Sequence, residues 1–242
     1  MRLSDFTALA FDCYGTLIDW ETGIWDAFQP LLLANGRGDI LRADLLGTFA
    51  SFESRYQADE PGLFYPALLE KCHRETAERY RMATSDALNG AFGASLAHWP
   101  AFPDTADALR ALKRHYKLII LSNVNRTGFE LSNRKLGVEF DDIITAQDVG
   151  SYKPNPRNFE VLLDVMQKKH GVAQNAILHT AQSLFHDHVP ATQAGLAKCW
   201  IDRQNLAETE NWGATAVVHE RPTVDFRFLT MGAMAKARET EG

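Results

Sequence analysis

Short apolar segments with strand-forming character alternate with helical patterns through most of the chain after residue 100. The run at 117–121, Lys-Leu-Ile-Ile-Leu, is typical of a strand that is buried on both faces. Alternation of strands and helices favours a parallel sheet with helices on both sides. The pattern therefore predicts an α/β fold with a doubly wound, mostly parallel sheet. The expected strands, in chain order, are residues 7–11, 117–121, 142–145, 176–179, 198–201 and 216–219.

The segment 18–99 interrupts this alternation, because its apolar residues recur at helical spacing and none of its parts could join a parallel sheet as a strand. We therefore expect an α/β core formed by residues 1–17 and 100–242, with a helical cap domain formed by residues 18–99 inserted after the first strand. The last residues, from about Ala235, are polar, and we expect them to be frayed. The helical patterns of the insert cover about residues 22–33, 40–56, 64–82 and 87–92.

The acidic composition limits the classes of partner. The 242-residue chain has a formal net charge of −6, so we expect neither nucleic acid nor an anionic membrane as a partner, since both attract basic surfaces. No apolar run is long enough to span a bilayer, and Asp5 interrupts the start where a signal peptide would be basic and then apolar. Three widely spaced cysteines form neither a disulfide framework nor a zinc motif. These features favour a cytoplasmic globular protein.

Polar residues follow four of the predicted strands. Asp12 follows the first strand, Ser122 and Asn123 follow the second, Lys153 lies in the loop after the third, and a polar stretch at 182–187 follows the fourth. Taken singly, each has an ordinary interpretation as a helix cap, a turn residue or a solvated lysine. The carboxyl ends of parallel strands, however, meet at one edge of the sheet, where ligands bind in this class of fold. The convergence of all four therefore predicts an active site at that edge.

Two other residue types near these positions allow competing interpretations. Cys13 could be a nucleophile, but no base is evidently placed for it, and a small buried residue at a strand end fits it better. His179, His186 and His188 invite a metal site, although they lack any sign of the groups that would orient them as ligands. His186 or His188 could instead tune the pKa of Asp187 or contact a leaving group.

Four ordered motifs resemble those of the haloacid dehalogenase superfamily, which implies a Rossmann-like core with a helical cap inserted after the first motif. In the phosphatases of this superfamily, acids that help to hold magnesium occupy the positions of Tyr14 and Gln182. Magnesium needs such oxygen ligands, so their replacement disfavours a phosphatase, and no metal or other cofactor is expected. Tyr14 resembles the corresponding residue of the metal-free L-2-haloacid dehalogenases. The motifs are Asp12-Cys-Tyr-Gly-Thr-Leu, Ser122-Asn123 after a strand, Ser151-Tyr-Lys-Pro, and Ser183-Leu-x-x-Asp187.

The resemblance implies a carboxylate nucleophile acting on a small carboxylic acid. Asp12 would displace a leaving group from the carbon next to the substrate carboxylate, and water would then hydrolyse the aspartyl ester. Lys153 would hold Asp12 ionised, and Asp187 would activate the water, with Lys153 as a possible contributor. Ser122 and Asn123 would bind the substrate carboxylate or the leaving group. Further candidates for substrate binding are Cys13, Tyr14, Gln182, His186 and Trp20, the last of which equally fits ordinary packing between core and cap.

The sequence also departs from the L-2-haloacid dehalogenases. Those enzymes have a Trp-Arg pair on the first cap helices whose arginine grips the halide, whereas the comparable helix here reads Thr-Phe-Ala-Ser-Phe-Glu at 48–53. Gln182 and Leu184 replace a serine and an asparagine of the fourth motif. The leaving group therefore stays open between a halide, fluoride and the ring nitrogen of L-azetidine-2-carboxylate, whose protonated form suits an acid or an aromatic wall.

Two other classes of function also remain open. They are a divergent magnesium phosphatase and a binding protein without activity. The resemblance allows a homodimer through the cap, but no exposed apolar stripe demands one.

Overall fold

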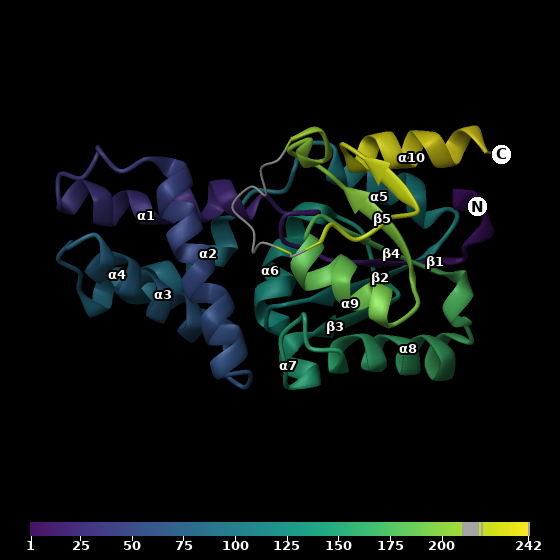
Figure 1. The fold of residues 1–242 in the computed structure, drawn as a ribbon, viewed down its shortest axis with the longest axis horizontal. Helices are drawn as coiled ribbons and strands as arrows, with labels where there is room; N and C mark the ends of the chain where they lie inside the picture. The colour runs from purple at the N-terminus through teal and green to yellow at the C-terminus, as the bar shows by residue number, and fades with distance from the viewer. Residues whose placement is uncertain (210–217, 219, 242) are drawn as a thin grey trace.

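The computed structural model describes residues 1–209, 218 and 220–241. Within these residues six strands form one sheet, and every neighbouring pair of strands is parallel. Their spatial order is β3-β2-β1-β4-β5-β6, so the sheet extends outward from β1 in both directions (Figure 1). This is the doubly wound order of Rossmann-type sheets, and it confirms the predicted α/β class. The strands are β1 (Ala8–Phe11), β2 (Lys117–Ser122), β3 (Asp142–Thr145), β4 (Ile177–Ala181), β5 (Ala197–Ile201) and β6 (Phe226–Phe228).

The two faces of the sheet carry separate apolar layers. Leu9 and Phe11 of β1 belong to one buried cluster, together with residues of α5, α6 and α10. Ala8 and Ala10 face the other way, into a cluster with residues of α8 and α9. This parity follows from the alternation of side chains along a strand. The core helices are α5 (Thr105–Lys113), α6 (Arg126–Leu136), α7 (Ala146–Val149), α8 (Arg157–His170), α9 (Val189–Gln193) and α10 (Met231–Thr240).

The segment 18–99, which we call the cap, supplies helices and no strand of the sheet among the described residues. Figure 1 shows it to one side of the sheet. Aromatic side chains fill its interior, where the Phe28 ring lies 4.5 Å from that of Phe92 and 5.2 Å from that of His73, centroid to centroid. The cap helices are α1 (Trp20–Ala34), α2 (Arg42–Asp59), α3 (Tyr65–Arg79) and α4 (Asp86–Gly93).

The two chain segments that join core and cap lie against each other. Asp19 donates a backbone hydrogen bond to Pro100 at 2.8 Å, and Ile18 forms an isolated antiparallel bridge with Ala101. The Trp99 side chain packs closely on α1 at Gly23, where any Cβ would come within 2.3 Å of the indole. Core and cap therefore meet at two paired linkers and a tightly packed tryptophan.

The described part of the chain contains one strand that we did not predict. The predicted strand at 216–219 falls almost entirely outside the described residues, since 216, 217 and 219 are not among them. The unpredicted strand is β6 at Phe226–Phe228, which is paired with β5. Its two phenylalanines have strand-forming character.

The expectation of a frayed C-terminus is wrong. Residues from 231 to 240 form α10, and the side chains of Met231, Met234 and Ala235 are buried. Their spacing gives one apolar stripe, which packs against α5. Glu241 then accepts hydrogen bonds from the backbone nitrogens of Leu3 and Ser4, at 3.0 and 2.6 Å. The polar residues lie on the opposite face of α10, and for this reason the polar composition of the segment did not indicate the buried stripe.

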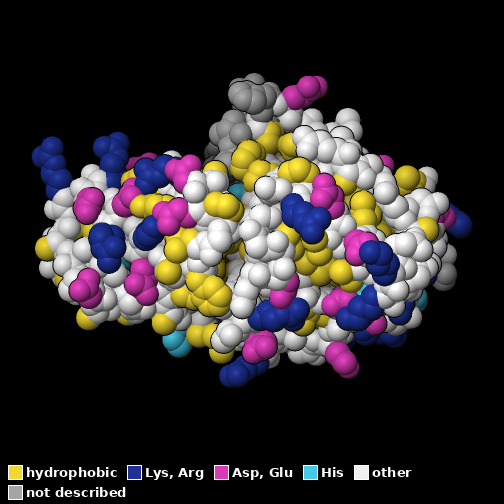
Figure 2. All heavy atoms as spheres, turned by 90° about the horizontal axis from the view of Figure 1, so that it is seen from below, with side chains coloured by type: hydrophobic (Ala, Val, Ile, Leu, Met, Phe, Trp, Pro, Cys, Tyr) yellow, Lys and Arg dark blue, Asp and Glu magenta, His cyan; other side chains and the backbone are white. Residues whose placement is uncertain are grey.

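The surface shown in Figure 2 carries acidic and basic side chains side by side, on the cap and on the core. No continuous basic area is visible on that face. Of the helices that the structure describes, none is both long enough and apolar enough to cross a membrane.

Candidate active site

The turn after β1 fixes the position of Asp12. Gly15 has a φ of +94°, which strains any residue with a Cβ, so glycine permits the tight turn here. The turn brings the hydroxyl of Thr16 back to donate a hydrogen bond to Asp12 Oδ2 at 2.8 Å. The same hydroxyl accepts a bond from the backbone nitrogen of Gln182 at 2.9 Å, which joins the ends of β1 and β4. Asp12 therefore lies where the strand order reverses, at the usual ligand site of this fold.

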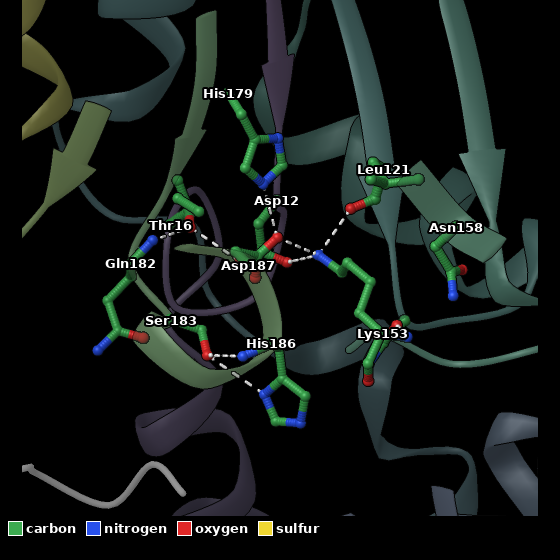
Figure 3. A network of polar contacts seen from close by, with 12 residues as sticks. Asp12, Thr16, Leu121, Lys153, Asn158, His179, Gln182, Ser183, His186 and Asp187 are labelled. Carbon is green, nitrogen blue, oxygen red and sulfur yellow. Dashed lines mark hydrogen bonds and ion pairs between the residues drawn. The ribbon is translucent and has the colours of Figure 1, made fainter. Parts of the chain in front are cut away.

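Lys153 joins Asp12 to a second carboxylate (Figure 3). Its Nζ donates to Asp12 Oδ1 at 3.0 Å, to Asp187 Oδ1 at 2.7 Å and to the carbonyl of Leu121 at 2.9 Å. These bonds use all three protons of the ammonium. The side chain is 1% exposed, so this is a buried, fully paired cation between two acids.

Asn123 sets the position of the Lys153 backbone. Its Oδ1 accepts a hydrogen bond from Lys153 N at 2.7 Å, and its Nδ2 donates to Lys153 O at 3.0 Å. Neither Ser122 nor Asn123 caps the following helix, because α6 begins after Asn125. The amide thus holds the loop that carries the lysine.

Burial and charge act against each other in this trio. Burial raises the pKa of Asp12, which the positive charge of Lys153 only partly offsets. Burial likewise opposes ionisation of Asp187, but Lys153 and a hydrogen bond from His179 outweigh it and hold the pKa of that carboxyl well below its usual range. Burial tends to lower the pKa of Lys153, yet the two carboxylates raise it. Asp187 is therefore firmly ionised, and Asp12 is the more basic of the two carboxylates.

A cavity that opens in part to solvent lies between these groups and the cap. The wall opposite Asp12 comes largely from one face of α2, through Ala50, Glu53, Ser54 and Gln57. Their spacing places them on one stripe of the helix. Trp20 of α1 and Tyr65 of α3 complete this cap wall.

Two hydrogen bonds hold the polar residues of the cap wall. Tyr65 donates its hydroxyl proton to Glu53 Oε1 at 2.7 Å. Gln57 Oε1 accepts a bond from Asn123 Nδ2 at 3.2 Å, which connects the cap to the core. Burial raises the pKa of Glu53 to about 7, against the opposing effect of the Tyr65 hydrogen bond. An acid thus faces the cavity from the cap side.

A family model matches more than half of the chain. The model, described as a haloacid dehalogenase-like hydrolase, matches residues 6–176, which include Asp12, Asn123 and Lys153. The chain belongs to this family of hydrolases. The matched segment spans β1, the cap and the strands up to β3, and it ends before Asp187 and the other cavity residues that follow β4.

Relatives of this haloacid dehalogenase-like hydrolase agree with the predicted branch. The (S)-2-haloacid dehalogenase of Pseudomonas putida is 26% identical over 239 residues, covering 87% of this chain and 97% of the relative. Haloacetate dehalogenase H-2 of Moraxella sp. (strain B) is 28% identical over 219 residues, covering 84% and 88%. The L-2-haloacid dehalogenase structure from Xanthobacter autotrophicus with chloropropionic acid covalently bound has a TM-score of 0.78 at 16% identity, covering 98% of this chain and all of that one. At 16% identity, the similarity to the Xanthobacter autotrophicus structure shows a shared fold.

The structure brings most of the predicted residues of the hydrolase to one cavity. The three candidates for catalysis, Asp12, Lys153 and Asp187, all line it. Of the candidates for substrate binding, those that also line it are Tyr14, Trp20, Asn123, Gln182 and His186.

The structure corrects the expectation for two residues. The side chains of Cys13 and Ser122 are buried and are not among those that line the cavity. Cys13 instead belongs to the apolar core, where burial raises the pKa of its thiol well above the usual range. Each adjoins a residue that does face the cavity, Asp12 or Asn123, so the alternation of the extended backbone turns it away.

The histidines differ in their surroundings. His186 lines the cavity, its Nδ1 lies 3.2 Å from Ser183 Oγ, and its buried Nε2 has no hydrogen-bond partner in the described part of the chain. Burial lowers the pKa of His186 to about 4, so the imidazole is neutral at pH 7. His179 instead bonds Asp187, and His188 bonds the carbonyl of Ala181. No group of three metal-ligating side chains is arranged to hold a metal among the described residues.

Sequence reasoning missed the polar part of the cap wall and two residues of the core. Glu53, Gln57 and Tyr65 were not candidates, although the α2 stripe that contains the first two has helical spacing in the sequence. Thr16 was not a candidate and His179 was considered only for a metal site, whereas they bond Asp12 and Asp187. No arginine from the described part of the cap lines the cavity. Arg42 donates to Thr22, and Arg55 pairs with Glu75.

Proposed function

We propose that this hydrolase cleaves a bond at the carbon next to the carboxylate of a small acid, with Asp12 as the nucleophile. One observation carries the proposal. A buried carboxylate at the end of β1, of raised basicity and bridged by Lys153 to Asp187, lines a cavity that the cap closes on the opposite side. A desolvated carboxylate held in one orientation is a suitable nucleophile for carbon.

The first step forms an ester. A lone pair on an Asp12 oxygen bonds to the substrate carbon from the side opposite the leaving group, which departs with the electrons of the broken bond. Lys153 and Thr16 keep the carboxylate in place through the bonds described above. Neutral donors that line the cavity, such as Ser54 and Gln182, are suited to hold the substrate carboxylate.

The second step hydrolyses the ester and regenerates Asp12. Water attacks the carbonyl carbon of the Asp12 side chain, and the substrate oxygen leaves as the hydroxyl of the product. Asp187 Oδ2 is buried without a hydrogen-bond partner in the described chain, so it is free to accept a bond from this water. The low pKa of Asp187 means that it holds the proton only in passing.

Two leaving groups fit this chemistry. The relatives named above are haloacid and haloacetate dehalogenases, which favours a halide. The second is the nitrogen of a strained ring, as in L-azetidine-2-carboxylate, and the acid in the cap wall favours it, since Glu53 occupies the side where a departing anion would need a cation.

Isotope labelling tests the proposed function directly. The enzyme is mixed in excess with (S)-2-chloropropionate, and separately with L-azetidine-2-carboxylate, in ¹⁸O-water without added metal. Mass spectrometry of the peptide containing Asp12 should show one ¹⁸O after turnover, because the attacking water contributes its oxygen to Asp12. Product formed with label in the substrate oxygen alone would overturn the mechanism. Turnover of p-nitrophenyl phosphate that requires magnesium would indicate the phosphatase instead.

A further inference from the structure

The cavity has an unusual charge balance for an enzyme that receives an anion. Three acids line it, Asp12, Glu53 and Asp187, against one cation among the described lining residues, Lys153. That cation already bonds two of the acids and a backbone carbonyl, so it has no proton left to donate to a substrate anion. A simple haloacid would therefore bring a further negative charge to a site that has no uncommitted cation.

The cap wall combines an acid with aromatic rings. Trp20 and Tyr65 line the cavity together with Glu53, and Tyr14 faces it from the core side. An ammonium group is stabilised both by a carboxylate and by the faces of aromatic rings. The cap side of the cavity is thus complementary to a cation.

We propose that Glu53 is the residue that selects the substrate, by binding a cationic amine nitrogen that is also the leaving group. The substrate class is a small zwitterionic acid with a strained ring whose nitrogen is attached to the carbon next to the carboxylate. This assignment rests on the proposed function, since it supplies the leaving group for attack by Asp12.

The chemistry balances without any other reactant. The substrate enters with a protonated ring nitrogen paired to the Glu53 carboxylate. Asp12 bonds to the α-carbon, the carbon–nitrogen bond breaks, and its electron pair stays on the nitrogen, which becomes a neutral primary amine. Water then hydrolyses the ester, and the proton that this step releases converts the amine to an ammonium. The product is a 2-hydroxy acid with a terminal ammonium group, and relief of ring strain drives the first step.

The surroundings of Glu53 predict the direction of the pH dependence. The carboxyl must be ionised to pair with the ammonium, and burial raises its pKa to about 7 in the free enzyme. The kcat/KM for the cyclic amino acid should therefore rise between pH 6 and pH 8. The ionisable groups around Glu53 are Asp12, Tyr14, Tyr65, Lys153, His186 and Asp187 in the cavity wall, and Cys72 and Tyr152, whose pKa values are raised by burial and by the charge of Glu53. Of these, burial lowers the pKa of His186 to about 4, and Lys153 holds the pKa of Asp187 well below its usual range against the effect of burial.

Substitution of Glu53 provides the test. The kcat/KM of wild type, Glu53→Gln and Glu53→Asp is measured for L-azetidine-2-carboxylate and for (S)-2-chloropropionate at pH 8. The ratio of the first value to the second should fall at least 100-fold in Glu53→Gln and recover in part in Glu53→Asp, which keeps the charge. The rise of kcat/KM between pH 6 and pH 8 should also disappear in Glu53→Gln. Asp44→Asn, an exposed acid on the same helix, is the matched control and should leave the ratio unchanged.

A binding measurement supports the test if turnover in Glu53→Gln is too low to measure. Calorimetry compares the binding of L-azetidine-2-carboxylate to Asp12→Asn and to Asp12→Asn/Glu53→Gln, where we expect at least a 30-fold loss of affinity in the double variant. An unchanged ratio and unchanged affinity, with ¹⁸O in Asp12 after reaction with chloropropionate, would overturn the role of Glu53 and leave the proposed function intact. Absence of label in Asp12 with both substrates would overturn both.

Discussion

The two walls of the cavity are built in different ways. The core wall gathers Asp12, Lys153 and Asp187 from the ends of separate strands and their loops, and these side chains bond one another. The cap wall takes Glu53 and Gln57 from one face of a single helix, and each bonds a neighbour at its edge, Tyr65 or Asn123. The core wall is therefore fixed by the topology of the sheet, whereas the cap wall depends on how one helix is oriented.

The core wall thus carries the groups that react, and the cap wall determines which substrate binds. A change in the core wall disturbs three coupled charges at once, and we expect it to remove the reaction. A change in the cap wall alters which molecule fits opposite the nucleophile. Substitutions in the two walls should therefore give effects of different size and kind.

The largest effect is expected from Asp12→Asn. An amide has no negative charge with which to attack carbon, so the single-turnover rate should fall by at least about 10⁴-fold. Gln57→Ala, a change in the cap wall, should cost less than about 100-fold. Rapid-quench measurement of product, with intact-mass analysis to exclude deamidation of the new asparagine, gives both rates. Similar losses in the two variants would contradict the division between the walls.

Lys153→Met should impair both stability and activity. It leaves two buried carboxylates without their shared cation, which we expect to cost about 3 to 5 kcal/mol in the free energy of unfolding at pH 7. The loss of kcat should be about 10³-fold or more, because Asp12 then tends to be protonated. Urea unfolding and steady-state kinetics measure the two effects. Lys168→Met, an exposed lysine of α8 that pairs with Asp164, is the control, and a comparable loss there would refute the argument.

The core wall was largely predictable from the sequence, and the cap wall was not. Asp12, Lys153 and Asp187 follow strands, and the ends of parallel strands must meet at one edge of a sheet. The stripe at 50–57 looks like any half-polar helix surface, since only packing decides which face of α2 meets the core. The prediction that Cys13 and Ser122 bind the substrate has a narrower weakness. Side chains alternate between the two faces of a strand, and the sequence does not show which side the residue at the end of each strand faces.

The C-terminal region shows the same limit. The stripe of Met231, Met234 and Ala235 has clear helical spacing, but its polar neighbours favoured a frayed tail. Burial of this stripe depends on the surface that α5 offers, more than a hundred positions earlier in the chain. The local sequence pattern therefore indicated the positions of strands and of the polar residues that follow them better than it indicated which face of a helix is buried.

Thr16→Val tests the support of the core wall. It removes the hydroxyl that donates to Asp12 Oδ2 and leaves the buried backbone nitrogen of Gln182 without its acceptor. We expect a loss of about 1 to 3 kcal/mol in stability and of about 10- to 100-fold in kcat, with KM changed less. Thr84→Val, which removes a hydroxyl bond to Asn89 in the cap, is the matched control and should change stability without this loss of kcat. Equal kcat values for the two variants would contradict the role of Thr16.

Glu53→Gln should change how stability depends on pH, and this effect is the smallest. Burial raises the pKa of Glu53 from 4.5 to about 7, so between these values the folded protein keeps a proton that the unfolded chain has lost. The contribution of Glu53 to stability is thus fully present below pH 4.5 and is lost as pH rises through 7. Glutamine lacks this dependence.

The free energy of unfolding of Glu53→Gln, relative to wild type, should therefore increase by about 1 to 3 kcal/mol between pH 5 and pH 8. Urea unfolding at the two pH values measures the difference, and Asp44→Asn on the same helix should show none of it. A difference that stays constant with pH would mean that the cap wall does not desolvate this acid. The contrast between a core wall with paired charges and a cap wall with an unpaired one would then fail, while the attack by Asp12 would be unaffected.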